Sequence, residues 1–185
     1  FTCYTSDFFL EDADEYRPLC WEIIKRRSDC FFMIITKRID QVAYKLPPDW
    51  GYGYDNVEIV CTIENQRQAD YRLPIYAALP VKHKSLCIEP LLSQVSIEIY
   101  NPKGIGIEKI ICGGESGPQN VARYCYEEWV IRLYSIAKKY KIPFCFKQTG
   151  TNFVHLDGTE EHVARHMQMT RALELPYHDF LVQNL

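Results

Sequence analysis

The stretch VEIVCTIEN, residues 57–65, decides the fold class of this chain. Its strand-like part is almost continuously apolar, interrupted only by Glu58, and it gives way to the polar pair Glu64 and Asn65. Strands that are apolar at consecutive positions, rather than alternating, are typical of a parallel sheet that is buried on both faces. The polar residues that follow then mark the end of the strand.

Five further runs have the same form. They are residues 1–5 before Ser6 and Asp7, residues 31–35 before Thr36, Lys37 and Arg38, residues 85–88 before Glu89, residues 107–112 before Gly113, Gly114 and Glu115, and residues 143–146 before Lys147 and Gln148. From Asp7 through Lys37, Glu64, Glu89 and Glu115 to Lys147, the steps are 30, 27, 25, 26 and 32 residues. A strand, a helix and two short loops fill roughly 30 residues, so the spacing predicts repeated strand–helix units.

Helical patterns lie between most of the runs. The predicted helices are Asp14–Arg27, Gln66–Leu79 and Glu127–Tyr140. We expect the first to bury Leu19, Ile23 and Ile24 on one face, and we expect Pro74 to kink or shorten the second. The apolar stripe of the third consists of Val130, Leu133, Ile136 and Ala137.

The predicted fold class is therefore α/β with parallel strands. A partial or complete TIM-like (β/α) barrel is favoured, because polar residues follow every run, whereas a doubly wound sheet concentrates functional residues at one switch point. Residues 1–150 are assigned to a barrel domain of six strand–helix units, and residues 151–185 to a C-terminal extension that packs on it. Because the chain opens at Phe1 inside a strand-like run, we expect one or more strands upstream.

Composition limits the function classes. The 185 residues are 47% hydrophobic and 24% charged, with a formal net charge of -3, which is not the basic footprint that duplex nucleic acid calls for. No apolar run approaches the roughly 20 residues that span a bilayer, and the first residues do not form a signal peptide. We expect a cytoplasmic protein that binds a small molecule; the sequence leaves the oligomeric state open.

Eight cysteines are present, without a C-x-x-C pair. Five lie inside apolar runs, where a reduced cysteine behaves as a small buried hydrophobe: Cys3, Cys61, Cys87, Cys112 and Cys145. We therefore expect free thiols and a reducing compartment. No metal site is predicted, although His162 and His166, four residues apart, are expected to share a helix face.

The candidate site is the set of polar residues at the strand ends, which a barrel would bring to one mouth. The catalytic candidates are Lys37, Glu64, Glu89 and Lys147, and the substrate-binding candidates are Asp7, Arg38, Asn65 and Gln148. Burying such groups costs free energy unless they pair or bind something. The alternative is that the same charges form only a layer of ion pairs that closes the barrel.

A third set of candidates is the glycine-rich segment after residue 112, and its members are Gly113, Gly114, Glu115 and Ser116. Two glycines after a strand let a ligand approach the backbone and leave amide N–H groups for an anion. Glu115 beside them is expected to accept hydrogen bonds from an amine. A plain Gly-Gly turn explains the segment equally well.

The motif series TSDFF, ITKR, TIENQ, CIEPLL, GGESG and FKQTG resembles the phage- and bacteria-associated gp-thirty-seven/gp-sixty-eight family, also called the three-Cys-motif family, of unknown function. The resemblance covers Phe1 to about Gly150. It implies a radical-SAM-like barrel, with an iron–sulfur cluster held by three upstream cysteines that these residues do not include. It also implies that Gly113, Gly114 and Glu115 contact the amino group of S-adenosylmethionine.

Three hypotheses follow. The first is a radical-SAM-like enzyme whose cluster, held by the full-length protein, is not expected in this chain alone. The second is a cluster-free barrel enzyme acting on a small anionic substrate, in which Lys37 or Lys147 could form a Schiff base. The third is a non-catalytic phage or host interaction protein. Fold alone does not choose among them.

Overall fold

A computed structural model describes residue 2 and residues 6–180 of the chain. In chain order its elements are η1 (Glu11–Ala13), α1 (Arg17–Arg26), β1 (Phe32–Thr36), α2 (Ile39–Val42), β2 (Val57–Thr62), α3 (Gln66–Ala78), β3 (His83–Ile88), η2 (Glu98–Tyr100), α4 (Pro102–Ile105), β4 (Ile107–Gly113), β5 (Tyr124–Tyr126), α5 (Glu127–Tyr140), β6 (Phe144–Gln148), β7 (Asn152–Val154), β8 (Glu160–His162), η3 (Arg165–Met167) and α6 (Gln168–Glu174). Five of the six predicted strands are confirmed. The run at residues 1–5 lies outside the described residues, except for Thr2.

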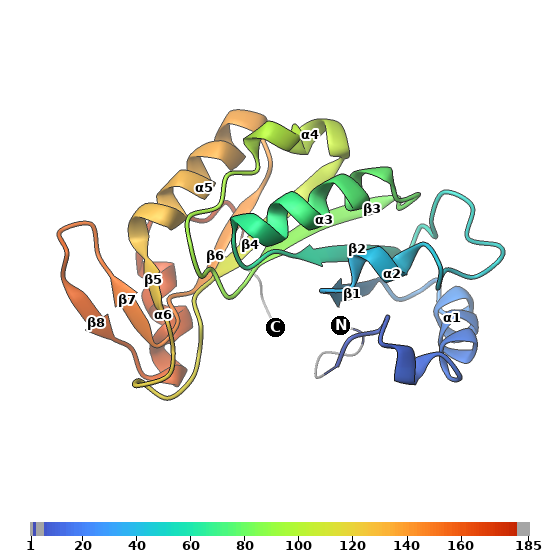
Figure 1. Cartoon of the computed structure of the whole chain (residues 1–185), viewed down its shortest axis with the longest axis horizontal. Coiled ribbons are helices and arrows are strands. Elements are labelled where there is room, and N and C mark those ends of the chain that lie inside the picture. Colours follow the sequence, from blue (N-terminus) through green and yellow to red (C-terminus); the bar gives the residue numbers. More distant parts are fainter. Residues whose placement is uncertain (1, 3–5, 181–185) are drawn as a thin grey trace.

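The main sheet has five parallel strands in the order β1-β2-β3-β4-β6 (Figure 1). Their order follows the chain without reversal, so the parallel α/β class is confirmed. Thr2 forms a parallel bridge to Ile34 at one edge, and His178 forms an antiparallel bridge to Cys145 at the other. The sheet is open in the described part of the chain, and a barrel is not shown.

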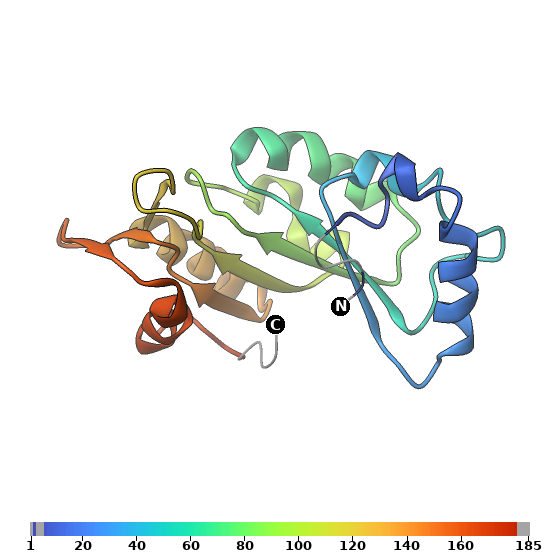
Figure 2. The same cartoon turned by 90° about the horizontal axis from the view of Figure 1, so that it is seen from below.

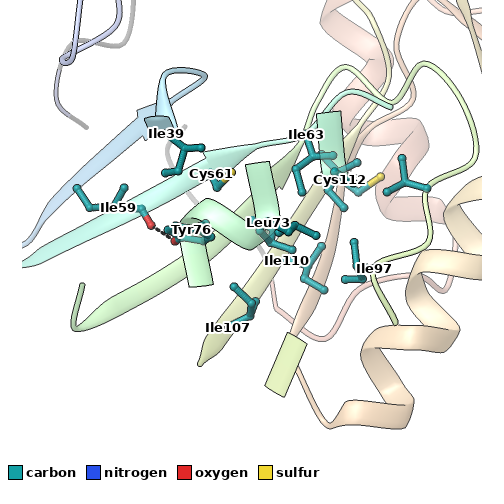
Figure 3. Packing of buried hydrophobic residues seen from close by; sticks show 14 of the residues in the cluster. Ile39, Ile59, Cys61, Ile63, Leu73, Tyr76, Ile97, Ile107, Ile110 and Cys112 are labelled. Atoms are coloured by element: carbon teal, nitrogen blue, oxygen red, sulfur yellow. Dashed lines mark hydrogen bonds between the residues drawn. The ribbon is translucent and has the colours of Figure 1, made fainter. Parts of the chain in front are cut away.

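Helices α3, α4 and α5 lie along one face of this sheet (Figure 1). Seen from below, strands β2, β3 and β4 stand in front of α3 and α5, so the two helices share a face (Figure 2). Ile59, Ile110 and Leu73 are among the fully or almost fully buried residues between the strands and α3 (Figure 3). Tyr76 of α3 is buried there too, and its hydroxyl donates to the Ile59 carbonyl oxygen and accepts from the Ser85 amide. The apolar runs therefore form the core that positions the strand ends.

The helix predictions have mixed outcomes. Helix α5 spans the predicted residues, with Val130, Leu133 and Ala137 buried. Helix α3 continues through Pro74 and ends at Ala78, one residue before the predicted end. The loop over residues 45–54 contains no helix or strand.

The predicted face of the first helix is wrong, because α1 buries Trp21 and Ile24 and exposes Leu19 and Ile23. Trp21 sets the orientation. The centroid of its indole ring lies 4.8 Å from that of the Phe8 ring and 5.2 Å from that of the Trp50 ring. Its Nε1 donates to the Lys45 carbonyl oxygen. This orientation buries the large indole ring and gives its N–H a partner, as buried tryptophans require, and it leaves Leu19 and Ile23 exposed.

A second sheet, with the order β5-β7-β8, was not predicted. Strand β7 pairs in parallel with β5 and in antiparallel with β8, through a turn that includes Asp157 and Gly158. Helix α6 contacts β6, and the Tyr177 carbonyl oxygen accepts from the Phe146 amide. The segment after residue 150 therefore packs on the main sheet, while the domain boundary at that residue stays a prediction.

The seven described cysteines form no disulfide with one another, and five of them are buried: Cys61, Cys87, Cys112, Cys125 and Cys145. Burial of the cysteines in the apolar runs is thus confirmed, except for Cys3, which lies outside the described residues. None of the helices in residues 6–180 is long and apolar enough to cross a bilayer.

Candidate functional site

Charged side chains gather at the carboxyl edge of the main sheet, because five parallel strands all end there. We call this group the strand-end cluster. Its members are Lys37, Glu64, Arg72, Glu89, Glu115, Arg123, Lys147 and Gln148. The cluster contains each predicted catalytic candidate, together with two arginines that the strand-end pattern did not predict.

Glu64, just after β2, is held between two cations. One carboxylate oxygen lies 2.7 Å from Lys37 Nζ and the other lies 2.8 Å from Arg72 Nη1, which also donates to the Thr62 carbonyl oxygen. Burial alone would raise the pKa of Glu64, but the hydrogen bond from Lys37 and the charge of Arg72 outweigh it, and the pKa is lowered. Glu64 is therefore a buried carboxylate that stays ionised at neutral pH.

Glu89, just after β3, meets the end of β6. Lys147 Nζ lies 3.2 Å from one Glu89 oxygen, and the side chains of Lys147 and Glu89 are only 13% and 16% exposed. The amide of Gln148 donates to Glu89 and to the Gly114 carbonyl oxygen, while its own oxygen accepts from Ser116 Oγ at 3.1 Å. The ends of β3, β4 and β6 are thus joined by one polar network.

Glu115, after β4, is paired with Arg123. Arg123 donates to it through its amide and its Nε, each at 2.8 Å, and through Nη2. The hydrogen bond from the Arg123 side chain is the main reason that the pKa of Glu115 falls from 4.5 to about 2. Glu115 is therefore ionised under all ordinary conditions.

The parts of the cluster lie within electrostatic range of one another. Burial raises the pKa of the Cys87 thiol to about 12, and four further charges act on the same group: Glu89, Lys147, Lys37 and Glu64. Lys37 also lowers the pKa of Glu115, and Glu64 raises that of Arg123. Cys87 of β3 thus lies within electrostatic range of both the Lys37–Glu64 pair and the Lys147–Glu89 pair.

The other predicted substrate-binding residues have local partners. Asp7 accepts from Thr36 Oγ1 at 2.8 Å and from the Lys37 amide, and it lies 3.3 Å from Arg38 Nη1. The side chain of Asn65 accepts from the Gln68 amide and so caps the N-terminus of α3. Asp7 and Asn65 therefore shape the loops that present Lys37 and Glu64, and their assignment to substrate stays a prediction.

Gly113 and Gly114 are required by the close approach of the protein's own chain. A Cβ atom on Gly114 would lie 2.0 Å from the Thr149 carbonyl oxygen, and one on Gly113 would lie 3.0 Å from the Gln148 side chain. The Gly114 amide donates to the Gln148 carbonyl oxygen at 2.9 Å. The expectation that both glycine amides are free for an anion is thus wrong for Gly114, because the backbone of β6 already uses it.

The two missed arginines come from outside the strand ends. Arg72 lies two turns along α3, and long side chains on a helix point back toward its N-terminus, which brings this one to Glu64. Arg123 lies in the loop before β5, and it follows Glu115 by eight residues, as Arg72 follows Glu64. A search for cations one or two helical turns after each strand-end carboxylate would have found Arg72.

Arg72 also carries an unusual feature. Its side chain is 10% exposed, yet its buried Nε has no hydrogen-bond partner among the described residues. Buried donors without a partner cost roughly 1–3 kcal/mol, so such an atom calls for a bound water or ligand. It lies beside the carboxylate that was predicted to act on substrate.

The histidine prediction is wrong in its geometry, because His162 ends β8 and His166 lies in η3, so the two do not share a helix face. Residue 2 and residues 6–180 contain no group of three or more His, Cys, Asp or Glu side chains that could hold a metal ion.

Comparison with known proteins gives the family of the chain. A family described as "Protein of unknown function (DUF5131)" matches residues 1–176, and the chain belongs to it. No curated protein matches the chain, and no solved structure does.

Proposed function

We propose that this chain is the substrate-binding part of an α/β enzyme whose site is the strand-end cluster. The observation that supports this proposal is the burial of Glu64, Glu89 and Lys147 at one edge of one sheet. An ion-pair layer that served stability alone would be poorly suited to this place, because buried pairs often contribute less than apolar residues of the same volume. The orphaned Nε of Arg72 adds a donor that a ligand or water would satisfy.

The charges favour a small ligand that carries both a cationic and an anionic group. Lys37 and Arg123 are 52% and 58% exposed, so their outer faces are open to a carboxylate or phosphate. Glu89 and Glu64 are buried acceptors that suit an ammonium group. An amino-acid moiety has both charges.

S-adenosylmethionine carries such a moiety, and we propose it as the ligand on the strength of the family resemblance. It supplies radical or methyl-transfer chemistry when bound. Within this chain Glu89 and Glu64 would hold the ammonium group in place of the Glu115 that the resemblance implies, because Arg123 already pairs with Glu115. Lys37 or Arg123 would hold the carboxylate. The iron–sulfur cluster that radical chemistry requires would be held by three upstream cysteines that these residues do not include.

We further propose that the main sheet is an arc of a (β/α) barrel. Its strand order follows the chain, and α3 and α5 share one face, as the outer helices of a barrel do. A reducing, cytoplasmic setting is also proposed, because the described cysteines form no disulfide with one another.

Calorimetric titration of the chain tests the ligand class. S-adenosylmethionine and methionine should bind saturably, and Glu89→Gln should weaken binding about tenfold, because a charge-assisted hydrogen bond is lost. Lys82→Met is the matched control, since Lys82 pairs with the exposed Asp55 at the opposite edge of the sheet. If neither compound binds, or if Glu89→Gln and Lys82→Met bind equally well, the proposed ligand is wrong.

A cluster-free enzyme for a small anion is the second candidate, favoured by the half-exposed Lys37 and Arg123. In that case simple carboxylates or phosphate should bind where methionine does not, and Lys37→Met should abolish the binding. The two candidates are separated by measuring iron and acid-labile sulfide on the protein encoded by the longest reading frame that contains this chain. About four irons per chain would support the radical enzyme.

A further inference from the structure

A second group of polar side chains surrounds a cavity of about 530 Å³ beside the three-stranded sheet. The cavity is lined by residues 117–119, by Thr151 and by residues 162–165. Its volume falls in the range of roughly 300–1,000 Å³ that small-molecule sites occupy. None of its lining residues belongs to the strand-end cluster, so it goes beyond the proposed function.

His162 reaches this cavity with its ring fixed by Asn152. The buried amide nitrogen of Asn152 donates to the carbonyl oxygens of Gln119, at 2.9 Å, and Ala122, at 2.6 Å. The amide oxygen is thereby turned toward His162 Nδ1, at 2.8 Å. An amide oxygen can only accept, so Nδ1 must carry the proton.

The other ring nitrogen of His162 is therefore the acceptor atom of the neutral imidazole. Within the described residues, Nε2 of His162 has no hydrogen-bond partner. Histidines that act as general bases or bind ligands have the same arrangement: a neighbouring side chain orients the ring through one nitrogen, and the other nitrogen faces the ligand. Nothing in the strand-end cluster uses it.

Arg165 lines the same cavity three residues later. The described part of the chain gives it no ion pair, whereas each cation of the strand-end cluster has one. None of the described residues that line the cavity is acidic. The cavity therefore contains one cation, Arg165, that has no ion pair within the described chain.

We propose that this cavity binds an oxyanion, the carboxylate or phosphate group of a small molecule. The forked guanidinium of Arg165 matches either group in a bidentate manner. His162 Nε2 accepts a hydrogen bond from a hydroxyl of the same molecule, or donates one to the anion when the ring is protonated. The loop at Gly117 and Pro118 lines the same cavity.

Calorimetric titration of the chain with inorganic phosphate and with succinate tests the site. At least one of them should bind saturably, and Arg165→Gln should weaken that binding about tenfold or more. Arg67→Gln is the matched control, because Arg67 on α3 is exposed and also has no ion pair in the described chain. His166→Gln is the control for His162→Gln, which should weaken binding less than Arg165→Gln does.

The two probes distinguish the sources of the anion, since phosphate alone would indicate a phosphorylated ligand and succinate alone a carboxylate. Failure of both to bind saturably overturns the proposal, and so does equal binding by the wild type and Arg165→Gln. Dependence on Arg165 separates this cavity from the strand-end cluster, because a probe held there by Lys37 or Arg123 would bind equally well to the wild type and to Arg165→Gln.

Nitrogen-15 NMR of the histidine rings gives a readout that needs no ligand. At pH 8 the neutral ring of His162 should be the Nδ1–H tautomer, and the probe that binds should shift its Nε2 resonance. The Nε2–H tautomer, or a resonance that the bound probe leaves unmoved, would contradict the assignment. The exposed positions of Arg165 and His162 allow both variants to fold.

Discussion

The two sheets of this protein are held together in different ways. In the main sheet, apolar side chains such as Ile59, Ile110 and Phe144 are fully buried against helices. In the three-stranded sheet each strand has three residues, and polar side chains in and beside it, such as Asn152 of β7 and Gln168 of α6, are buried and bonded to backbone atoms. The stability from apolar packing is spread over many contacts, whereas that from a buried amide depends on a few specific hydrogen bonds. The two regions should therefore respond differently to substitution.

The largest effect is expected from Ile110→Ala in the main sheet. Ile110 is fully buried on β4, between β3 and β6. The cavity left by its side chain should lower the free energy of unfolding by about 4 kcal/mol, while Ile110→Val should cost about 1 kcal/mol. Urea denaturation measures both. Hydrogen exchange should rise in both sheets, because α6 and residues 177–179 lie against β6; a rise confined to the main sheet would contradict this dependence.

A somewhat smaller loss is expected from Gly114→Ala, where the two regions join. The new Cβ would lie 2.0 Å from the Thr149 carbonyl oxygen, and backbone atoms cannot move aside cheaply. We expect a cost of about 3 kcal/mol, at the upper end for overpacking. Gly117→Ala is the control, because its Cβ would lie 3.7 Å from that of Ala122, an ordinary contact. Equal melting temperatures for the two variants would show that β4 and β6 are not packed as closely as described.

The same contrast explains which parts of the fold the sequence predicted. Consecutive apolar residues identified β1, β2, β3, β4 and β6, because strands of a parallel sheet are buried on both faces. Strands β5, β7 and β8 are too short to show a period, and their stability depends on partners far away in sequence, such as Asn152 with Gln119. No local pattern encodes that pairing.

The candidate site shows the same division. The strand ends predicted Lys37, Glu64, Glu89 and Lys147 as neighbours, because parallel strands end at one edge. The ion-pair partners of Glu64 and Glu115 could not all be predicted, because Arg72 reaches Glu64 from a helix and Arg123 reaches Glu115 from a loop. The orientation of α1 was also hidden, because it depends on contacts of Trp21 with residues of two other segments.

A local effect is expected from Asn152→Ala in the three-stranded sheet. The substitution leaves the carbonyl oxygens of Gln119 and Ala122 without their donor, which should cost about 2 kcal/mol. Hydrogen exchange should rise in β7 and β8 and in residues 117–122, and the core of the main sheet should stay protected. Gln119→Ala keeps the carbonyl oxygen and should change stability by less than about 0.5 kcal/mol. A uniform loss of protection over both sheets would erase the distinction between the two regions.

The smallest effect is expected from the pair of Glu115 and Arg123, which is a pH effect at the border of the two regions. The pKa of Glu115 is lowered from 4.5 to about 2, mainly by the hydrogen bond from Arg123, so the folded state favours the ionised form. Its contribution to stability is therefore fully present above pH 4.5 and is lost as the pH falls toward 2. Arg123 is 58% exposed, and solvent screening should keep the contribution under about 1 kcal/mol.

Melting temperatures of the wild type and Glu115→Gln should differ by a constant amount above pH 5 and converge below it. A difference that grows on acidification would mean that the carboxylate is not the stabilised form. In Arg123→Gln the carboxyl carbon of Glu115, followed by NMR, should titrate closer to 4.5, because the donor that lowers its pKa is gone.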